Sequence, residues 1–335
     1  MTQRQITIYG AGISGIVAAI NLAREGFTVE VIEKRNQIGG SPRWHPSVHQ
    51  QTFNLKKTSE YIDIDVSSCF NSVKRHTFYY YGRKSVVDMP NNSYVCEKGQ
   101  RSFSIENFLY SEAKRYGVKF VFGETLDPKA INLKRAYGYK CIVATGLEIE
   151  LYKTLDIKHT IVQGFRSSRT VDNGGLAISY FGDYTNHDFA YVASSGDLMF
   201  SLLFARRGVN EQSLQAFNKH LLESEGIAFD DWQYSTGCVP LETNLVKNDV
   251  VLAGTISGMI DPFYLNGISA ALISGKVAAQ FFIDAEMAIY QFKQFTGNFY
   301  LKRYLKSVSM RMPFKRFSFP LFPLINSHLK WVGVI

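Results

Sequence analysis

The sequence predicts an α/β protein with a doubly wound parallel sheet and a smaller α+β domain. Three observations predict this class. The first 35 residues alternate strand, glycine turn, helix and strand, and a second strand–turn–helix unit begins near residue 249. Between these units the chain has short segments and clustered aromatic residues. Strands that alternate with helices favour a parallel sheet covered by helices, whereas short consecutive strands favour a separate domain.

The composition is that of a globular protein with one or two domains. The 335 residues are 46% hydrophobic and 20% charged, which excludes a largely disordered chain. No segment reaches the roughly 18 consecutive apolar residues of a membrane-spanning helix. The four cysteines are widely spaced, so we expect free thiols rather than disulfides or a zinc site. The sequence opens on a strand pattern rather than a signal peptide, so the expected location is cytoplasmic.

Hydrophobic periodicity defines the first elements. Residues 6–9 and 28–33 are β-branched and apolar, which predicts two strands. Residues 14–24 place Ile16 and Ile20 at helical spacing among small residues, which predicts a helix between the strands. This strand–helix–strand unit indicates two parallel neighbouring strands.

Later segments continue the pattern. A helix is expected at 104–116, strands at 117–122, 139–144 and 249–253, and a long helix from Gly267. We therefore assign three segments to the parallel-sheet domain: 1–50, 94–160 and 245–290. The smaller domain then contains 51–93 and 161–244, with a helix near 210–224, and residues 291–335 form a C-terminal segment.

The first strand runs directly into a glycine turn. Gly10, Gly12 and Gly15 have the spacing Gly-x-Gly-x-x-Gly, and Ser14 lies in the first turn of the helix that follows. The first glycine allows a tight turn, the second lets the backbone approach a pyrophosphate, and the third allows close helix–strand packing. The N–H groups at the helix start favour an anion. This context predicts a Rossmann-like, dinucleotide-binding domain.

An acidic residue at the end of the second strand supports the same prediction. Glu33 lies 18 residues after Gly15, where a carboxylate accepts hydrogen bonds from ribose hydroxyls. A carboxylate at this position repels a 2′-phosphate, so NADP is not expected as the ligand of this site.

The residues beyond Glu33 favour FAD. Ile32-Glu33-Lys34-Arg35 followed by Ile38-Gly39-Gly40 resembles the N-terminal signature of flavoproteins with two dinucleotide-binding domains. In that family the second glycine pair lets the chain pass close to the cofactor. The resemblance implies FAD as the cofactor, with Lys34, Gly40 and Arg43 among its contacts.

A second glycine-rich segment at 250–279 is similar to the C-terminal FAD motif of the geranylgeranyl reductase-like family, which is related to aromatic hydroxylases and lycopene cyclases. The resemblance assigns cofactor contacts to Gly254, Asp261, Gly267 and Ile268. Backbone N–H groups at Gly267 and Ile268 can stabilise negative charge on the flavin ring. One position departs from the family, because Thr255 stands where an acid is usual.

Two further matches fall between the glycine clusters. Thr145 and Gly146 resemble the Ala-Thr-Gly strand end of many such flavoproteins. Arg101, which precedes a predicted helix, resembles a family arginine that contacts the FAD phosphates. A surface position for Arg101 is an equal alternative.

Candidate chemistry follows the second glycine pair. His45 and His49 lie just beyond it, so they are candidates for proton transfer, and Arg43 is a candidate for substrate binding. A structural role for each histidine remains open. The chain has no second Gly-x-Gly-x-x-Gly, so electrons are expected from transient NAD(P)H, a separate donor protein, or the substrate.

The C-terminal segment is basic and aromatic. Residues 301–335 contain seven Lys and Arg and no Asp or Glu, so they hold most of the net charge of +8. Basic and aromatic residues over 298–335 favour peripheral contact with an anionic membrane. Packing of this segment on the body of the protein is the main alternative. Its apolar content argues against the other alternative, nucleic acid, so no nucleic-acid partner is expected.

The resemblance to the geranylgeranyl reductase-like family implies an FAD-dependent oxidoreductase. The expected reaction is hydride transfer at flavin N5 that reduces or dehydrogenates a C=C bond of a hydrophobic, isoprenoid or lipid substrate. A flavin-dependent monooxygenase is the first alternative. A non-catalytic or non-redox flavoprotein is the second.

Overall fold

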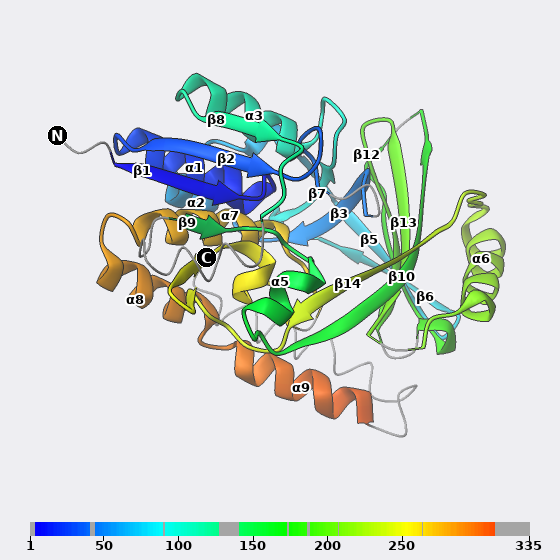
Figure 1. The fold of residues 1–335 in the computed structure, drawn as a ribbon. Helices are drawn as coiled ribbons and strands as arrows, with labels where there is room; N and C mark the ends of the chain where they lie inside the picture. Colours follow the sequence, from blue (N-terminus) through cyan, green and yellow to red (C-terminus); the bar gives the residue numbers. More distant parts are fainter. Residues whose placement is uncertain are drawn as a thin grey trace.

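The computed structural model describes residues 4–40, 44–89, 91–126, 141–172, 174–185, 188–206, 208–262 and 264–311. Three sheets organise this part of the chain (Figure 1). The largely parallel sheet lies on one side of the molecule, and the larger antiparallel sheet stands on the other side. The predicted combination of a doubly wound α/β domain with a smaller α+β domain is confirmed.

The first sheet has six strands in the order β15-β16-β9-β1-β2-β8. All pairs are parallel except β15 with β16. The strand order places the two predicted halves of the domain side by side, because β9 lies between β1 and β16. Its strands are β1 (Gln5–Tyr9), β2 (Thr28–Glu33), β8 (Lys119–Phe122), β9 (Cys141–Val143), β15 (Val246–Lys247) and β16 (Val250–Leu252).

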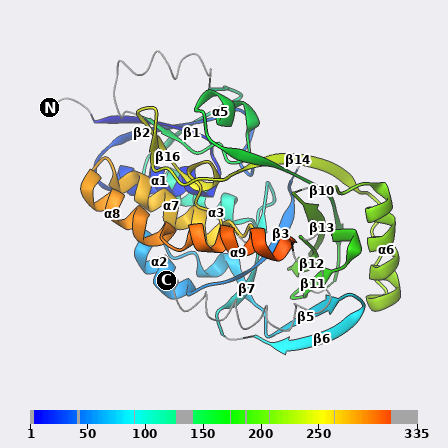
Figure 2. The same cartoon turned by 90° about the horizontal axis from the view of Figure 1, so that it is seen from below.

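The second sheet has seven strands in the order β14-β10-β13-β12-β11-β5-β6. It is antiparallel except where β5 pairs with β11. Helix α6 (Glu211–Glu225) corresponds to the helix predicted near 210–224. It covers one face of the seven-stranded sheet (Figure 2). The strands are β5 (Arg75–Tyr80), β6 (Arg83–Asp88), β10 (His159–Thr170), β11 (Ala177–Phe181), β12 (Phe189–Ser195), β13 (Leu198–Ala205) and β14 (Gln233–Pro240).

A small third sheet lies between the two large ones. It consists of β3 (Ser47–Thr52), β7 (Ser93–Lys98) and β4 (Phe70–Ser72), with β7 in the centre. Side chains from 53–70 pack into the core of the parallel-sheet domain, together with α2 (Leu55–Ile62). Of the segment 51–93 that we assigned to the smaller domain, only β5 and β6 join the seven-stranded sheet. The domain boundary expected at residue 51 stays a prediction.

Helix α1 (Ile13–Arg24) is the most buried helix of the parallel-sheet domain. It packs against α7 (Ile268–Gln280) and α3 (Ile105–Arg115). A Cβ on Gly275 would lie 2.5 Å from the Ser14 carbonyl oxygen and 2.8 Å from Val17 Cβ. Glycine at position 275 therefore sets how closely α7 approaches α1.

The remaining described helices lie at the edges of the domains. They are α5 (Ile149–Thr154), α8 (Ala285–Thr296) and α9 (Phe299–Arg311). Helix α9 is described as far as Arg311, and residues 312–335 lie outside the described residues. Among the described helices, none has the length and apolar character needed to cross a bilayer.

The close approach of α1 and α7 generates a first prediction. Alanine normally stabilises a helix interior by about 1 kcal/mol relative to glycine. Gly275→Ala should instead lower the free energy of unfolding by about 1–3 kcal/mol, because the new methyl group overlaps the backbone of α1. Urea denaturation measures this change.

Gly12→Ala is the matched control, because no atom lies within 4 Å of a Cβ at Gly12. A Gly275→Ala protein as stable as the control would contradict the close packing of the two helices.

Candidate functional site

The first glycine turn joins the ends of three strands. Gly10 has φ +108°, and its N–H donates to the Ile32 carbonyl oxygen at 2.8 Å. A Cβ on Gly10 would lie 2.5 Å from the Ala144 carbonyl oxygen, and one on Gly15 would overlap the Gly10 carbonyl oxygen. Both positions therefore require glycine, for backbone geometry in the first case and for helix–strand contact in the second.

The start of α1 is open. Gly12 is its N-cap residue, no side chain caps the helix, and no acid lies in its first turn. The described helices α2, α3, α6 and α8 each have a capping side chain, from Asn54, Ser104, Asn210 and Asp284. The uncapped N–H groups of α1 and the space beside Gly12 match what a pyrophosphate needs.

Glu33 is held at the edge of this turn. Its Oε2 accepts from the Ala11 N–H and its Oε1 from the Arg35 N–H, both at 2.9 Å. The carboxylate is only 7% exposed, and each oxygen retains a lone pair for a ribose hydroxyl. The Nζ atom of its neighbour Lys34 lies 2.5 Å from Glu148 Oε1. Lys34, a predicted cofactor contact, is therefore ion-paired within the protein.

The second glycine cluster lies across the sheet edge from the first. Gly254 follows β16 with φ +75°, and a Cβ there would overlap the Ser14 hydroxyl of α1. Its N–H donates to Ser274 Oγ at 2.7 Å. Gly267 is the N-cap of α7 and has no side chain that could cap the helix, and Ile268 is the first helical residue. The structure thus packs α1 and α7, which both begin at a glycine, against each other beside the parallel sheet.

Asp261 lies in the loop between Gly254 and Gly267, and its carboxylate is bonded within the protein. It accepts from the Tyr264 N–H at 2.7 Å and from Lys302 Nζ of α9 at 3.0 Å. The loop that resembles the family FAD motif is therefore attached to the C-terminal helix. Thr255, which replaces the usual acid, begins this loop and is half-buried.

Three buried polar atoms near the strand ends have no hydrogen-bond partner among the residues that the structure describes. They are Arg35 Nε after β2, Gln51 Nε2 at the end of β3 and Thr145 Oγ1 after β9. Gln51 Oε1 accepts from the Ser269 N–H at 3.0 Å, which places this side chain at the start of α7. Buried polar atoms are normally paired, so these three fit a polar ligand at this edge. Thr145 and Gly146 were predicted, whereas Arg35 and Gln51 were not among our predicted contacts.

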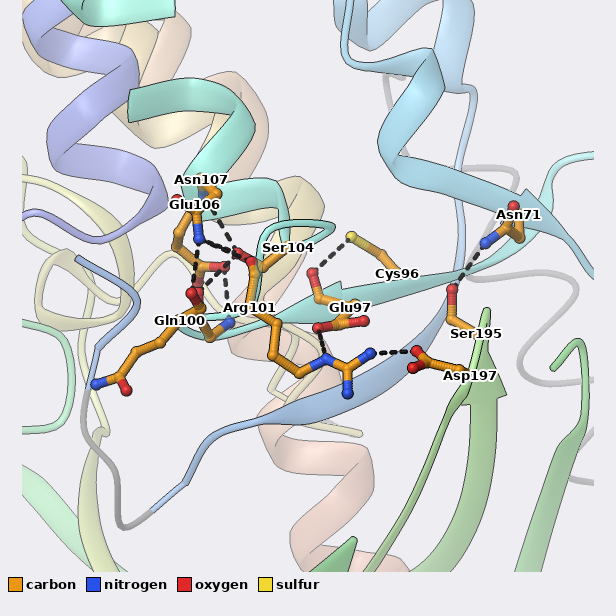
Figure 3. A network of polar contacts seen from close by, with 11 residues as sticks. Asn71, Cys96, Glu97, Gln100, Arg101, Ser104, Glu106, Asn107, Ser195 and Asp197 are labelled. Atoms are coloured by element: carbon orange, nitrogen blue, oxygen red, sulfur yellow. Dashed lines mark hydrogen bonds and ion pairs between the residues drawn. The ribbon is translucent and has the colours of Figure 1, made fainter. Parts of the chain in front are cut away.

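Arg101 lies in a polar network between domains (Figure 3). Its Nε is 2.9 Å from Glu97 Oε1, and its terminal nitrogen pairs with Asp197, which follows β12. Asn71 Nδ2 donates to Ser195 Oγ at 2.7 Å beside it. The structure places Arg101 in a bridge from β7 to the seven-stranded sheet, and its contact with FAD phosphates stays a prediction.

The two predicted histidines belong to one hydrogen-bonded chain. His45 Nδ1 is 2.7 Å from Ser47 Oγ, and the same Oγ is 2.9 Å from His49 Nε2. Burial, together with the positive charge of Lys98, lowers the pKa of His49 to about 3. Burial and the same charge also hold the pKa of His45 well below its usual value. Both rings are therefore neutral near pH 7. Arg43 lies outside the described residues.

The open start of α1 generates a second prediction. Gly12→Val should weaken FAD binding about 10- to 100-fold, because the side chain occupies the approach to the N–H groups that would bind the pyrophosphate. Flavin fluorescence titration measures this loss. Gly12→Ala should give a smaller loss, and the melting temperature without FAD should remain unchanged in both. Undiminished affinity in Gly12→Val would contradict the assignment of this turn.

Comparisons with known proteins agree with this geometry. A family model described as NAD(P)-binding Rossmann-like domain matches residues 8–57. The flavin-containing monooxygenase FMO GS-OX-like 7 of Arabidopsis thaliana is 36% identical over 72 residues, which cover 22% of this chain and 16% of that protein. The chain spans less than a fifth of the length of this relative and of others matched in the same way.

Solved structures match over nearly the whole chain. A geranylgeranyl bacteriochlorophyll reductase-like protein from Thermoplasma acidophilum has a TM-score of 0.69 at 18% identity, covering 91% of this chain and 86% of the other. A 2-methyl-3-hydroxypyridine-5-carboxylic acid oxygenase has a TM-score of 0.66 at 15% identity, covering 93% and 94%. The chain therefore has the fold of the FAD-dependent oxidoreductases that include these two proteins.

Proposed function

We propose that this chain is an FAD-dependent oxidoreductase that reduces or dehydrogenates a C=C bond of a hydrophobic substrate. One observation carries the proposal. Helices α1 and α7, which both begin at a glycine, pack against each other beside the parallel sheet. Glu33 lies beside the start of α1, and the polar atoms Arg35 Nε, Gln51 Nε2 and Thr145 Oγ1, which have no partner among the described residues, lie near the ends of β2, β3 and β9. This combination of anion-binding N–H groups and a ribose-binding acid suits a dinucleotide.

The residues present fit FAD. The turn at 10–15 would bind the pyrophosphate, Glu33 the adenosine ribose, and the start of α7 the pyrimidine edge of the flavin ring. When bound, FAD supplies hydride transfer through its N5 atom. The protein supplies position, exclusion of water and a route for protons. NAD(P)H bound transiently, or a separate donor protein, would supply the electrons.

The face of the seven-stranded sheet that is turned toward the FAD-binding domain supports a hydrophobic substrate. Tyr191, Phe200, Leu202 and Phe204 from β12 and β13 form one apolar cluster there with Ile260 of the second glycine loop. Half-buried Trp44, Leu147, Phe189 and Leu265 pack against the same cluster. Apolar and aromatic linings with few polar groups favour apolar ligands. An isoprenoid or lipid chain fits this chemistry.

A monooxygenase is the second candidate function. The FMO GS-OX-like relatives and the pyridine-carboxylate oxygenase with the same fold favour it. The two candidates differ in their use of oxygen. A monooxygenase consumes oxygen when its substrate is bound, whereas a C=C reductase works without oxygen.

The proposal predicts a yellow protein whose flavin accepts electrons. The purified chain, loaded with FAD, should show a flavin absorption spectrum that bleaches under anaerobic conditions with NADPH, NADH or dithionite. Mass spectrometry should then detect hydrogenated geranylgeraniol, used as the probe. Gly12→Val is the control, and it should retain less FAD than the wild-type chain after the same loading.

Each outcome of this experiment favours one alternative. Turnover that requires oxygen favours the monooxygenase. A flavin that no donor reduces favours a non-redox flavoprotein. Failure of the wild-type chain to bind FAD overturns the proposal.

We further propose that α8 and α9 form a peripheral contact with an anionic membrane. These helices follow one another along one side of the molecule (Figure 2). Lys302 and Lys306 of α9 face the body, where they pair with Asp261 and Asp188 at 3.0 Å. The exposed surface of the two helices instead carries large apolar and aromatic side chains: Met287, Tyr290, Tyr300, Leu301 and Tyr304.

This arrangement combines both alternatives considered for the C-terminal segment. The described part of that segment packs on the body through its lysines, while its aromatic side chains are exposed. Tyr300 is 80% exposed. Aromatic rings suit the headgroup level of a bilayer, and five of the seven basic residues after position 300 lie outside these two ion pairs.

Vesicle sedimentation tests this contact. The full chain should bind phosphatidylserine-containing vesicles more tightly than pure phosphatidylcholine vesicles, and about 0.5 M salt should weaken binding. Tyr300→Ser combined with Tyr304→Ser should lower affinity roughly 5- to 10-fold. Tyr234→Ser, an exposed tyrosine of β14, is the control. Equal binding to both vesicle types would contradict an anionic membrane as the partner.

A further inference from the structure

A continuous chain of four side chains crosses from the seven-stranded sheet to β3. Tyr191 OH of β12 is 3.2 Å from His49 Nδ1. The chain continues from His49 Nε2 to Ser47 Oγ at 2.9 Å, and from Ser47 Oγ to His45 Nδ1 at 2.7 Å. His49 thus uses both of its ring nitrogens in these hydrogen bonds, and His45 uses one. Sequence reasoning identified His45 and His49 but not the serine and tyrosine that connect them.

Strand geometry aligns most of these groups. Ser47, His49 and Gln51 alternate along β3, and residues two apart lie on the same face of a strand. His45 precedes β3 and joins the row through Ser47 Oγ. One end of this row is at the second glycine pair, because a Cβ on Gly40 would lie 3.0 Å from the His45 ring. The other end is at the start of α7, through Gln51. The row therefore extends from the second glycine pair to the start of α7, and the proposed cofactor would contact both of these regions.

All members of the chain are neutral near pH 7. Burial dominates the lowered pKa of each histidine, and the nearby cations Lys98 and, for His45, Arg166 disfavour imidazolium further. Burial raises the pKa of Tyr191. Each neutral imidazole has one N–H and one lone pair, so each transmits the direction of hydrogen bonding from one neighbour to the next.

We propose that Tyr191, His49, Ser47 and His45 form a proton relay that protonates the substrate at the seven-stranded sheet. The inference rests on the proposed function, in which one carbon of a C=C bond receives hydride and the other needs a proton. Tyr191 is the catalytic residue of the relay because it meets the substrate. Ser47 and the histidines act through it.

The transfer leaves no charge in the protein. The Tyr191 O–H bond breaks as its proton bonds to the substrate carbon, and His49 Nδ1–H returns a proton to the phenol oxygen. His49 Nε2 takes the Ser47 hydroxyl proton, and Ser47 Oγ takes the proton of His45 Nδ1. His45 Nε2 then takes a proton from solvent. Both rings exchange tautomers, and the reverse sequence serves dehydrogenation.

A purely structural hydrogen-bonded connection between β3 and β12 is the alternative. In a structural connection each contact acts locally. In a relay, a change at Tyr191 is transmitted to His45, two hydrogen bonds beyond His49. Tautomer populations measured by ¹⁵N NMR of the histidine side chains distinguish the two cases, and they need no substrate.

The expected result has a definite direction. Tyr191→Phe leaves His49 Nδ1 without a partner, and a buried N–H without an acceptor costs more than an unpaired lone pair. His49 should therefore place its proton on Nε2 and donate to Ser47, which then donates to His45 Nδ1. The Nε2–H form of His45 should increase about fivefold. In a protein that also carries Ser47→Ala, Tyr191→Phe should leave the tautomer populations of His45 unchanged.

Tyr234→Phe, on an exposed tyrosine of β14, is the matched control and should leave both histidines unchanged. Signals are assigned with His45→Gln and His49→Gln. The relay is overturned if the tautomer populations of His45 do not change in Tyr191→Phe. It is also overturned if they change equally in the protein that carries Ser47→Ala as well. Separate FAD titration distinguishes the two proposals. Wild-type protein that binds no FAD overturns the proposed function, whereas FAD binding with uncoupled histidines overturns the relay alone.

Discussion

The contact of α1 with both glycine clusters is the constraint on which the rest of the structure depends. Gly15 lets the first turn of α1 meet the end of β1, and Gly254 and Gly275 let the second cluster approach the same turn. A side chain at any of these positions would separate the two halves of the parallel-sheet domain. Because the two glycine clusters touch, α1 and α7 pack together beside the parallel sheet, and the proposed dinucleotide would contact the starts of both helices.

Strand β3 connects this edge of the parallel sheet to the seven-stranded sheet. It pairs with β7 of the small sheet, while one of its faces carries Gln51 to the start of α7 and His49 to Tyr191 of the seven-stranded sheet. Arg101 and Asn71 add polar contacts between the same two domains. The relative position of the domains is thus fixed by neutral hydrogen bonds near the site and by ion pairs at its edge.

Local patterns predicted the elements whose geometry depends on nearby residues. The turn at 10–15, Glu33 and the start of α7 follow from spacing along the chain, because each is a strand end or a helix start. Pairings across long distances were not predicted. The contact of His49 with Tyr191 depends on how two sheets pack, and the Lys34–Glu148 pair joins the ends of distant segments. Periodicity contains no information about either contact.

The ion pairs also bear on how the site would hold a dinucleotide's negative charge. Two of the cationic residues that the sequence predicts as cofactor contacts, Lys34 and Arg101, are paired with acids of the protein. Neutral N–H groups at the start of α1 remain, with a helix dipole equivalent to roughly half a positive charge. Arg35 adds a buried nitrogen beside Glu33 that has no partner in the described part of the chain. Recognition by fixed backbone dipoles needs no rearrangement of mobile side chains, so binding would depend on the geometry of the glycine turn more than on the number of nearby cations.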